Sequence, residues 1–343
     1  MGVVSMSRYY DSSLLLSRNS LFNAIISARS DGKTYDFKKK CIKRFLKKGE
    51  QFIYVRRFKT ELKKIDKFFD DIKVEFPDYD FKVDSGNFYI KKNDVKKWNK
   101  NHICGGYLCL STQLTVKSVS YPKVTWIGFD EFIISTKGYY RYLEDEVTSF
   151  LELYSTIARL RDVKVMFMAN SISSINPYFL YFNIRLDKNK RFITKNDFTV
   201  EYHVPEEHKE AVKKTRFGKM ISGTDYGKYA IDNEFAEDIV DFIEKIPKNS
   251  ECRFTIYYKG KHYGVFYNYT YGNLYISNKY NSNSKFIYVL RVEDIREGYL
   301  MVHKPKDNPY FKHLSTCFRE NRVRFENLYI KDVMFEIFRK ITF

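Results

Sequence analysis

Hydrophobic and polar positions follow two different periods along the first two-thirds of the chain. Short apolar runs, which predict buried strands, alternate with segments whose apolar residues recur every three or four positions, which predict helices. The runs predict strands at Phe22–Ala28, Gln51–Arg57, Val124–Phe129 and Val163–Ala169, and the longer spacing predicts helices at Lys33–Lys48, Thr60–Phe76 and Glu144–Arg161. Strands that alternate with helices are typical of an α/β fold with a largely parallel sheet.

The other segments differ in composition. Residues 80–120 are rich in Lys and Gly and predict hairpins and loops, whereas residues 205–247 are charged and mostly helical in pattern, as expected of a connecting region. Residues 252–292 predict short strands crowded with Tyr and Phe, and a final helix is expected from Lys331 to Lys340. We therefore predict three domains, at residues 1–197, 198–228 and 229–343.

The composition indicates a folded protein with an affinity for polyanions. The chain has 343 residues, of which 44% are hydrophobic and 18% aromatic, enough for a substantial core. Its 60 Lys and Arg against 42 Asp and Glu give a formal net charge of +18. Such an excess attracts nucleic acid at long range, although a Lys-rich coding bias would produce the same charge.

The sequence also favours the cell interior. No apolar run is long enough to cross a bilayer, and Met1–Arg8 lacks the pattern of a secretory signal, so we expect no membrane partner. The cysteines are odd in number and lack zinc-site spacing, which favours reduced thiols in a cytoplasmic compartment. They are Cys41, Cys104, Cys109, Cys252 and Cys317.

A phosphate-binding loop is predicted between the first strand and the first helix. The segment reads Ser27-Ala28-Arg29-Ser30-Asp31-Gly32-Lys33-Thr34, with Ser27 in place of the usual first Gly. Backbone amides and the helix N-terminus would face the phosphates of ATP, Lys33 would neutralise the β and γ charge, and Thr34 would ligate Mg²⁺. Taken alone, Gly-Lys-Thr is also an ordinary turn before a helix.

Two adjacent carboxylates, Asp130 and Glu131, follow the strand Val124–Phe129. In a parallel sheet the carboxyl ends of the strands lie at the ligand crevice. There Asp130 would hold Mg²⁺ through water and Glu131 would polarise the attacking water. Together with the loop, this pair predicts a P-loop NTPase of the ASCE type, which carries its catalytic glutamate beside the Mg²⁺-binding acid.

Three further residues are candidates for the reaction. Asn170 ends the last strand of the series, where it would contact the γ-phosphate or the lytic water, or simply form a turn. Arg159 and Arg161 follow the preceding helix. They would either complement the negative end of that helix or supply an arginine finger to the ATP of a neighbouring subunit.

Seven stretches are similar to the DNA-encapsidation ATPases of small tailed phages, the phi29-like packaging motors. They occur in one order over nearly the whole chain: GEQFIYVRRFK (49–59), FDEF (129–132), NPYFLYFN (176–183), KKTRFG (213–218), GTDYG (223–227), FIEK (242–245) and FRK (338–340). The resemblance implies a ring ATPase domain, a linker domain, and a C-terminal α+β domain similar to the RNase H-like nuclease of larger terminases.

The resemblance also implies the partners. The motor would dock at the portal of the prohead as a homo-oligomeric ring, a pentamer, and pull double-stranded DNA inward in the host cytoplasm; a packaging RNA stays open. By position, Lys33 and Thr34 match the phosphate loop and Asp130 and Glu131 the acidic pair. Arg159 matches the trans-acting arginine, although a segment one residue shorter leaves Arg161 as an alternative. The predicted DNA-binding residues are Lys59, Lys117 and Arg56.

The C-terminal domain is expected to be a vestigial nuclease kept for docking. A two-metal nuclease of that fold needs an acid on its first strand, and the predicted strand Arg253–Tyr258 has none; Asp232, Asp238 and Asp241 precede it. Two other functions stay open. One is another P-loop enzyme on nucleic acid, such as a helicase-like or plasmid-transfer ATPase, and the other is a non-enzymatic basic nucleic-acid-binding protein with a decayed loop.

Overall fold

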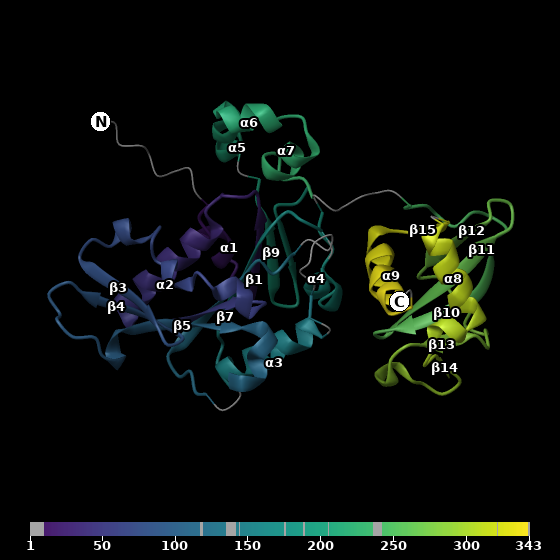
Figure 1. The fold of residues 1–343 in the computed structure, drawn as a ribbon, viewed down its shortest axis with the longest axis horizontal. Helices are drawn as coiled ribbons and strands as arrows, with labels where there is room; N and C mark the ends of the chain where they lie inside the picture. The colour runs from purple at the N-terminus through teal and green to yellow at the C-terminus, as the bar shows by residue number, and fades with distance from the viewer. Residues whose placement is uncertain are drawn as a thin grey trace. The chain divides into compact units, whose positions relative to one another are not determined.

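The chain folds into two compact units, Met1–Glu237 and Asp238–Phe343 (Figure 1). The computed structural model describes residues 10–116, 119–134, 142–143, 145–174, 176–187, 189–204, 206–235, 242–320 and 322–341. The charged segment 205–247 is divided between them, with residues up to 237 in the first unit and the rest in the second. The finer division into three domains stays a prediction.

The first unit is built on a nine-stranded sheet, counted over its described residues, in the order β3-β4-β5-β2-β6-β7-β1-β9-β8. The six strands from β5 to β9 in that order are parallel, and the β3–β4 hairpin and β8 add antiparallel edges. The bounds are β1 Phe22–Ser27, β2 Gln51–Arg56, β3 Tyr79–Asp84, β4 Asn87–Lys92, β5 Ile103–Cys109, β6 Val124–Asp130, β7 Lys164–Asn170, β8 Phe192–Lys195 and β9 Phe198–Tyr202. The predicted α/β fold with a mostly parallel sheet is confirmed.

Helices cover both faces of this sheet (Figure 1). The helix α2 (Lys33–Lys48) buries Phe37 and Ile42 in a cluster on one face, and α3 (Glu146–Ala158) buries Phe150 in a cluster on the other. A Cβ at Gly128 would lie 2.3 Å from the Phe37 ring, so glycine there lets α2 approach β6 closely. Both faces of the central strands are therefore buried, which explains their continuous apolar runs.

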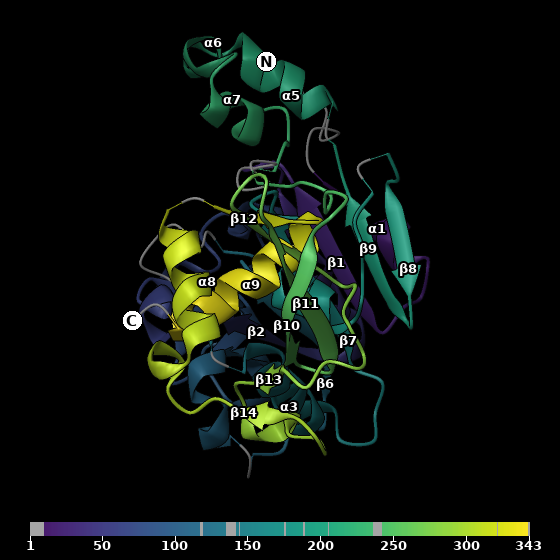
Figure 2. The same ribbon diagram turned by 90° about the vertical axis from the view of Figure 1, so that its right-hand side faces the viewer.

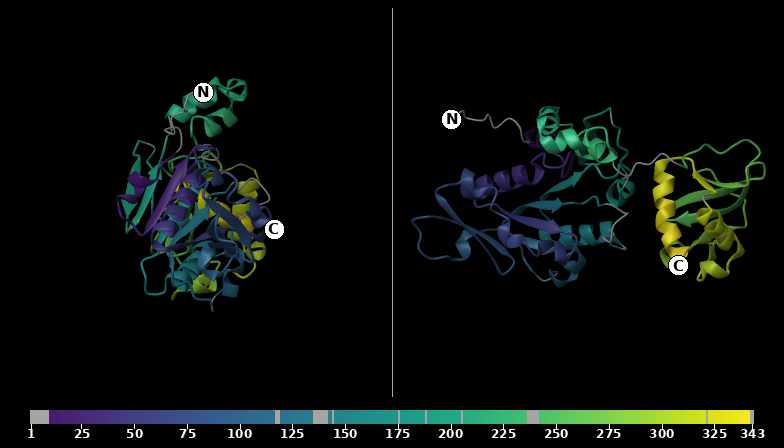
Figure 3. Two further views of the ribbon diagram at one scale, coloured as in Figure 1. Left: turned by 90° about the vertical axis from the view of Figure 1, so that its left-hand side faces the viewer. Right: turned by 45° about the horizontal axis from the view of Figure 1, so that its top comes forward.

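Shorter helices complete the first unit. They are α1 (Ser13–Leu16), α4 (Pro177–Tyr181), α5 (Glu206–Lys214), α6 (Arg216–Ile221) and α7 (Asp225–Ala230). The last three gather in one cluster, drawn in green in Figures 2 and 3. Asn233 connects this cluster to the end of β9. Its side-chain amide donates to the backbone carbonyl of His203 (2.9 Å), and its backbone carbonyl accepts from the hydroxyl of Tyr202.

Two expectations for the first unit were wrong. The predicted helix Thr60–Phe76 is instead three short 3₁₀ turns, η2 (Lys59–Leu62), η3 (Ile65–Lys67) and η4 (Lys73–Glu75). The neighbours Phe68 and Phe69 are both buried, which one face of a regular helix does not favour. Residues 80–120 contain the expected hairpin, but they also contain β5, a parallel strand of the main sheet, followed by further turns at η5 (Lys100–His102) and η6 (Leu110–Val116).

The second unit has a six-stranded sheet in its described residues, in the order β14-β13-β10-β11-β12-β15. The strands are β10 Glu251–Tyr258, β11 Lys261–Asn268, β12 Asn273–Ser277, β13 Ile287–Val289, β14 Leu300–Met301 and β15 Val323–Phe325, with turns η7 Val292–Asp294 and η8 Pro305–Asp307. The helices α8 (Pro309–Arg319) and α9 (Leu328–Ile341) lie beside these strands (Figure 2). The expected final helix is confirmed, although it begins three residues earlier than predicted.

Two further observations concern the helices and the cysteines. Within the described residues, the helices are all too short or too polar to cross a membrane. The five cysteines are free thiols, and only Cys252 is not buried. Burial raises the pKa of the Cys104 thiol, so this side chain behaves as a small apolar group of the core.

Candidate nucleotide-binding site

The predicted phosphate loop connects β1 to α2. Gly32 adopts a left-handed conformation (φ +96°) and precedes the first residue of α2, where a glycine offers no side chain to cap the helix. Ser30 is also left-handed (φ +63°). Arg29 and Ser30 are exposed, whereas Ala28 is buried. A helix N-terminus in this state is a ready site for an anion such as phosphate.

Lys33 is buried beneath this loop. Its Nζ donates to Ser27 Oγ (3.0 Å), to the carbonyl of Ala28 (2.8 Å) and to Asn170 Oδ1 (3.1 Å). Burial lowers the pKa of Lys33 to about 8, in spite of the attraction of nearby acids. The hydroxyl of Ser27 thus has a specific task where most such loops have glycine, because it holds the ammonium group. The structure also brings Asn170 to the same lysine.

Asp31 is the one acid of the loop, and its side chain is buried. Neither carboxylate oxygen has a hydrogen-bond partner among the described residues, and the imidazole Nε2 of His203 lies 3.8 Å away. Burial lowers the pKa of His203, in opposition to the attraction of Asp31 and Glu201. Asp31 therefore points away from the open side of the loop, toward the end of β9.

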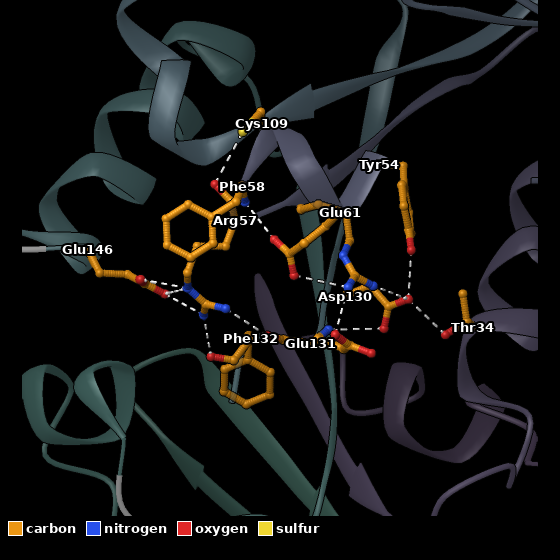
Figure 4. Close-up of polar contacts among 11 residues, drawn as sticks. Thr34, Tyr54, Arg57, Phe58, Glu61, Cys109, Asp130, Glu131, Phe132 and Glu146 are labelled. Carbon is orange, nitrogen blue, oxygen red and sulfur yellow. Dashed lines mark hydrogen bonds and ion pairs between the residues drawn. The ribbon is translucent and has the colours of Figure 1, made fainter. Parts of the chain in front are cut away.

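The acidic pair meets the loop at the carboxyl end of β6. Thr34 Oγ1 donates to Asp130 Oδ2 over 3.1 Å, and the hydroxyl of Tyr54 donates to the same oxygen over 2.7 Å (Figure 4). The backbone amide of Glu131 donates to Asp130 Oδ1 over 3.0 Å. Glu131 itself is left-handed (φ +53°), and its side chain is half-exposed. Lys33, Thr34 and the two carboxylates therefore gather at the carboxyl ends of the parallel strands.

Arg56, the last residue of β2, lies against these acids rather than alone on the surface. Its Nη2 is 2.6 Å from Glu131 Oε2 and 3.0 Å from Glu61 Oε1, and its Nη1 is 3.6 Å from Asp130 Oδ2. The predicted role of Arg56 in binding DNA stays a prediction. In this arrangement its guanidinium is paired with the carboxylate that would polarise the attacking water.

Sequence reasoning missed four polar residues at this edge: Tyr54, Arg57, Glu146 and Tyr229. Tyr54 and Arg56 alternate on β2, beside the strand that ends in Asp130, and this alternation next to a predicted acidic strand was a usable signal. Tyr229 comes from α7, and the side chain of Asn170 is hydrogen-bonded to its hydroxyl, whose pKa is raised by burial. Because α7 is distant in sequence from the loop, the pattern carried no sign of this contact.

The two arginines after α3 lie at the other end of the parallel strands, the end at which β6 begins. The guanidinium of Arg161 donates to the carbonyls of Tyr121 (2.7 Å), Pro122 (3.0 Å), Val124 (2.7 Å) and Ile157 (2.7 Å), around the beginning of β6. Arg159 directly follows the last residue of α3, is exposed, and has a left-handed φ of +53°. The length of β6 thus separates both arginines from Asp130 in the same chain.

Of the remaining two predicted DNA contacts, the structure describes only Lys59. Lys59 is exposed at the beginning of η2, three residues after Arg56. Lys117 follows η6 and lies outside the described residues. The structure therefore places one of the two predicted DNA-binding lysines at the surface, three residues after the strand β2 ends.

A mostly parallel sheet with a lysine-bearing loop and an acidic pair at one edge has the architecture of a P-loop nucleoside triphosphatase. In the sheet order, β7 lies between the loop-bearing β1 and the acid-bearing β6. This class is the one predicted from the sequence.

Comparisons with known proteins identify the family. A model of the Podovirus DNA encapsidation protein (Gp16) family matches residues 4–343, and the chain belongs to this family. It is 38% identical to the DNA packaging protein of Bacillus phage phi29 over 336 residues, or 98% of both chains. The predicted resemblance to phage DNA-encapsidation ATPases is confirmed.

Solved structures agree with this assignment. The bacteriophage Phi-29 viral genome packaging motor assembly aligns with a TM-score of 0.75 at 36% identity, over 97% of this chain and 99% of that one. The crystal structure of the N-terminal domain of the DNA packaging ATPase from bacteriophage phi29 aligns with a TM-score of 0.52 at 39% identity, over 57% of this chain and 97% of that one. The prediction of an ATPase is confirmed by this likeness.

Proposed function

We propose that this chain is the ATP-hydrolysing subunit of a motor that drives double-stranded viral DNA into a preformed prohead. The observation that carries the proposal is the convergence of Lys33, Thr34, Asp130 and Glu131 at one sheet edge, in a member of a DNA encapsidation family. A site of this kind can hydrolyse ATP, and the free energy of that reaction would drive the movement of DNA. The net charge of +18 would attract the polyanionic DNA.

The roles follow from the positions of the side chains. The loop Ser27–Thr34 and the N-terminus of α2 would hold the phosphates of ATP, and the ammonium group of Lys33 would leave Ser27 and Asn170 for the β and γ oxygens. Asn170, which is also hydrogen-bonded to the hydroxyl of Tyr229, would then contact the γ-phosphate. Glu131 would orient the attacking water once its carboxylate leaves Arg56.

The residues present fit a magnesium ion. The hydroxyl of Thr34 and the carboxylate of Asp130 are hard oxygen donors, and they lie 3.1 Å apart beside the phosphate loop. These two residues would hold the ion, Thr34 directly and Asp130 through water. When bound, Mg²⁺ neutralises charge that develops on the transferred phosphoryl group.

A ring is the assembly that best explains Arg159. This residue is exposed and lies two positions before Arg161, which contacts the beginning of β6; because β6 is roughly 20 Å long, ATP beside Asp130 of the same subunit lies out of reach. An arginine in that position can act only on a neighbouring subunit. Arg161 donates to four backbone carbonyls and is less suited to the task. We therefore propose Arg159 as the trans-acting finger of a homo-oligomeric ring, a pentamer, docked on the portal.

DNA contacts would be electrostatic and independent of sequence, as a motor that moves a whole genome requires. Lys59 is a candidate for such a contact, because it is exposed at the beginning of η2. Lys117 would also contact the DNA. Arg56 would bind either a DNA phosphate or the carboxylate of Glu131. A packaging RNA at the portal would be a further partner of the docked motor in the host cytoplasm.

We propose that the second unit is a vestigial RNase H-like nuclease that serves for docking. Supporting this fold, β10, β11 and β12 form an antiparallel meander and β13 pairs in parallel with β10. The strand β10 begins two residues earlier than predicted and includes an acid, Glu251, but that carboxylate is exposed and paired with Arg253. No group of three possible metal ligands occurs among the described residues. Asp232 pairs with Lys209, and Asp238 and Asp241 lie outside the described residues.

The decisive experiment measures ATP hydrolysis by the full chain with and without long duplex DNA and purified portal-bearing proheads. We expect slow hydrolysis by the chain alone and a strong stimulation when both are present, together with protection of the packaged DNA from added nuclease. Hydrolysis that responds to DNA but not to proheads would instead indicate another P-loop enzyme on nucleic acid. A failure to bind ATP with Mg²⁺ in calorimetry would indicate a non-enzymatic DNA-binding protein.

A further inference from the structure

The backbone at Glu131 is held in a conformation that an ordinary residue avoids. Its φ of +53° is left-handed, and glutamate has no special tolerance for this region. Such a conformation persists only where the surroundings fix it. Glu131 is also the residue whose carboxylate must point at the attacking water, so whatever fixes this backbone also directs the carboxylate.

The side chain of Arg57 makes the fixing contacts. Its Nη1 donates to the carbonyl of Glu131 over 3.1 Å, and its Nη2 donates to the carbonyl of Phe132 over 2.8 Å, so two successive carbonyls are held (Figure 4). Arg57 is only 1% exposed. An arginine placed so deeply has lost its hydration and requires a complete set of partners.

Glu146 supplies the countercharge. Both of its carboxylate oxygens accept from Arg57, at 2.6–3.0 Å, and it also accepts from the amide of Leu143 (2.9 Å) and the hydroxyl of Tyr178 (3.3 Å). As the first residue of α3, it is further favoured by the positive end of that helix. The guanidinium is therefore locked in one orientation, with its remaining N–H groups directed at the loop after β6.

The two neighbouring arginines thus contact the same glutamate in different ways. Arg56 is paired with the Glu131 carboxylate, which is half-exposed and can exchange partners. Arg57 holds the Glu131 backbone from a buried position that cannot exchange. We propose that Arg57, locked by Glu146, is a positioning residue that keeps Glu131 in its left-handed conformation and aims its carboxylate at the attacking water. This inference rests on the proposed role of Glu131 in ATP hydrolysis.

The test separates the charge of Arg57 from its donor geometry. In Arg57→Lys the ammonium group keeps a positive charge beside Glu146, but it is a compact donor that cannot bridge a carboxylate and two carbonyls at once. We expect the kcat for DNA-stimulated ATP hydrolysis to fall about 100-fold, because a displacement of about 1 Å at a reacting group has effects of that size. The dissociation constant for a fluorescent ATP analogue should stay unchanged, because the phosphate loop is untouched.

A second variant removes the ion pair without leaving a buried charge. The double substitution Arg57→Met with Glu146→Met replaces the pair by apolar side chains of similar length, which often preserves stability. We expect this variant to melt at or near the temperature of the unchanged chain and yet to hydrolyse ATP as slowly as Arg57→Lys. Arg44→Lys is the matched control, since Arg44 pairs with Glu50 (2.7 Å) away from the site and should keep full activity.

Each outcome has its own meaning. If the double variant is folded and its kcat matches that of the unchanged chain, the pair is only structural and the inference is wrong. A normal kcat for Arg57→Lys also shows that the inference is wrong, and this result decides alone if the double variant does not fold. Glu131→Gln is measured in parallel: if it hydrolyses ATP normally, the proposed site itself has failed, whereas a dead Glu131→Gln beside fast Arg57 variants overturns only the role of Arg57.

Discussion

The two sheets of this molecule differ in how the acidic side chains on them are arranged. At one edge of the first sheet, Asp130 and Glu131 stand side by side and share Arg56, with Thr34 and Tyr54 also bonded to Asp130. In the second unit the acids are dispersed. Glu251 pairs with Arg253, Glu336 with Lys259, and the carboxylate of Asp294 accepts from the backbone amide of Lys259.

The difference shows how a site can be told from ordinary surface charge. Adjacent carboxylates repel each other, and gathering them beside a buried lysine brings no advantage to folding. A chain keeps such a cluster where a phosphate and its metal ion will take up the charges. Glu251, Asp294 and Glu336 of the second unit have no such implication, because none of the three lies directly beside another in the chain and each has a basic side chain or a backbone amide as its partner.

The largest effect should come from removing the carboxylate charge at the first site. Glu131→Gln should lower the kcat for ATP hydrolysis on the order of 10⁴-fold, because the amide cannot accept a proton from water, while ATP binding is retained. Lys33→Ala should also abolish turnover, by loss of the phosphate contact. Glu336→Gln in the second unit is the control and should leave hydrolysis unchanged. Comparable losses in Glu131→Gln and Glu336→Gln would remove the contrast between the two sheets.

The next effect depends on assembly. Arg159→Ala should lower stimulated hydrolysis about 10³-fold, as expected for the loss of an arginine finger. Subunits with Arg159→Ala keep an intact site, and subunits with Glu131→Gln keep an intact arginine. Mixtures of the two on proheads should therefore recover part of the activity. Absence of recovery at every mixing ratio would show that Arg159 does not act on the ATP of a neighbouring subunit.

A smaller effect is expected from Arg56→Ala. Loss of its ion pair should free the Glu131 carboxylate and raise hydrolysis without DNA about fivefold, since a partly exposed pair contributes about 1 kcal/mol. The ratio of DNA-stimulated to basal rates should fall correspondingly. Arg44→Ala, which loses a similar pair with Glu50, serves as the control. A lower rate both with and without DNA would mean that Arg56 assists Glu131 instead of restraining it.

The smallest effect concerns the second sheet. Glu251→Gln removes the acid that begins β10, and we expect packaging and ATP hydrolysis to continue at the unchanged rate. Supercoiled DNA incubated with the unchanged chain and Mg²⁺ or Mn²⁺ should stay intact. Metal-dependent nicking that disappears in Glu251→Gln would show that the second unit is a working nuclease and that the two sheets carry two active sites.

Much of the nucleotide site could be predicted from the sequence, because its parts leave local signals. The apolar runs of β1 and β6, the glycines at 32 and 49 around α2, and the two acids at the end of β6 each mark an element boundary. The predicted α2 matches the observed one at both ends. Parallel strands then bring Lys33 and Asp130 together by topology alone.

The rest was hidden because it depends on contacts between distant segments. The strand β5 contains Gly105, where a Cβ would lie 2.5 Å from the Phe52 carbonyl, so the close approach to β2 removes the apolar signal of a strand. The helical period of Thr60–Phe76 gave way to the packing of Phe68 against Phe88, with ring centroids 4.2 Å apart. The pairing of Arg57 with Glu146 joins residues 89 positions apart, which no local pattern reveals.

The helix α3 has Glu146 at its first position and Arg159 immediately after its last. Its 13 residues form a rod about 20 Å long, so a tilt of about 5° at the glutamate end would displace the arginine by about 2 Å. If Glu131 and Arg159 have the roles proposed above, a change in the backbone of Glu131 would thus reach the ATP of the next subunit as a displacement of Arg159. A rigid helix of this kind would allow the subunits of a ring to hydrolyse ATP one after another, because it couples the site of one subunit to that of the next.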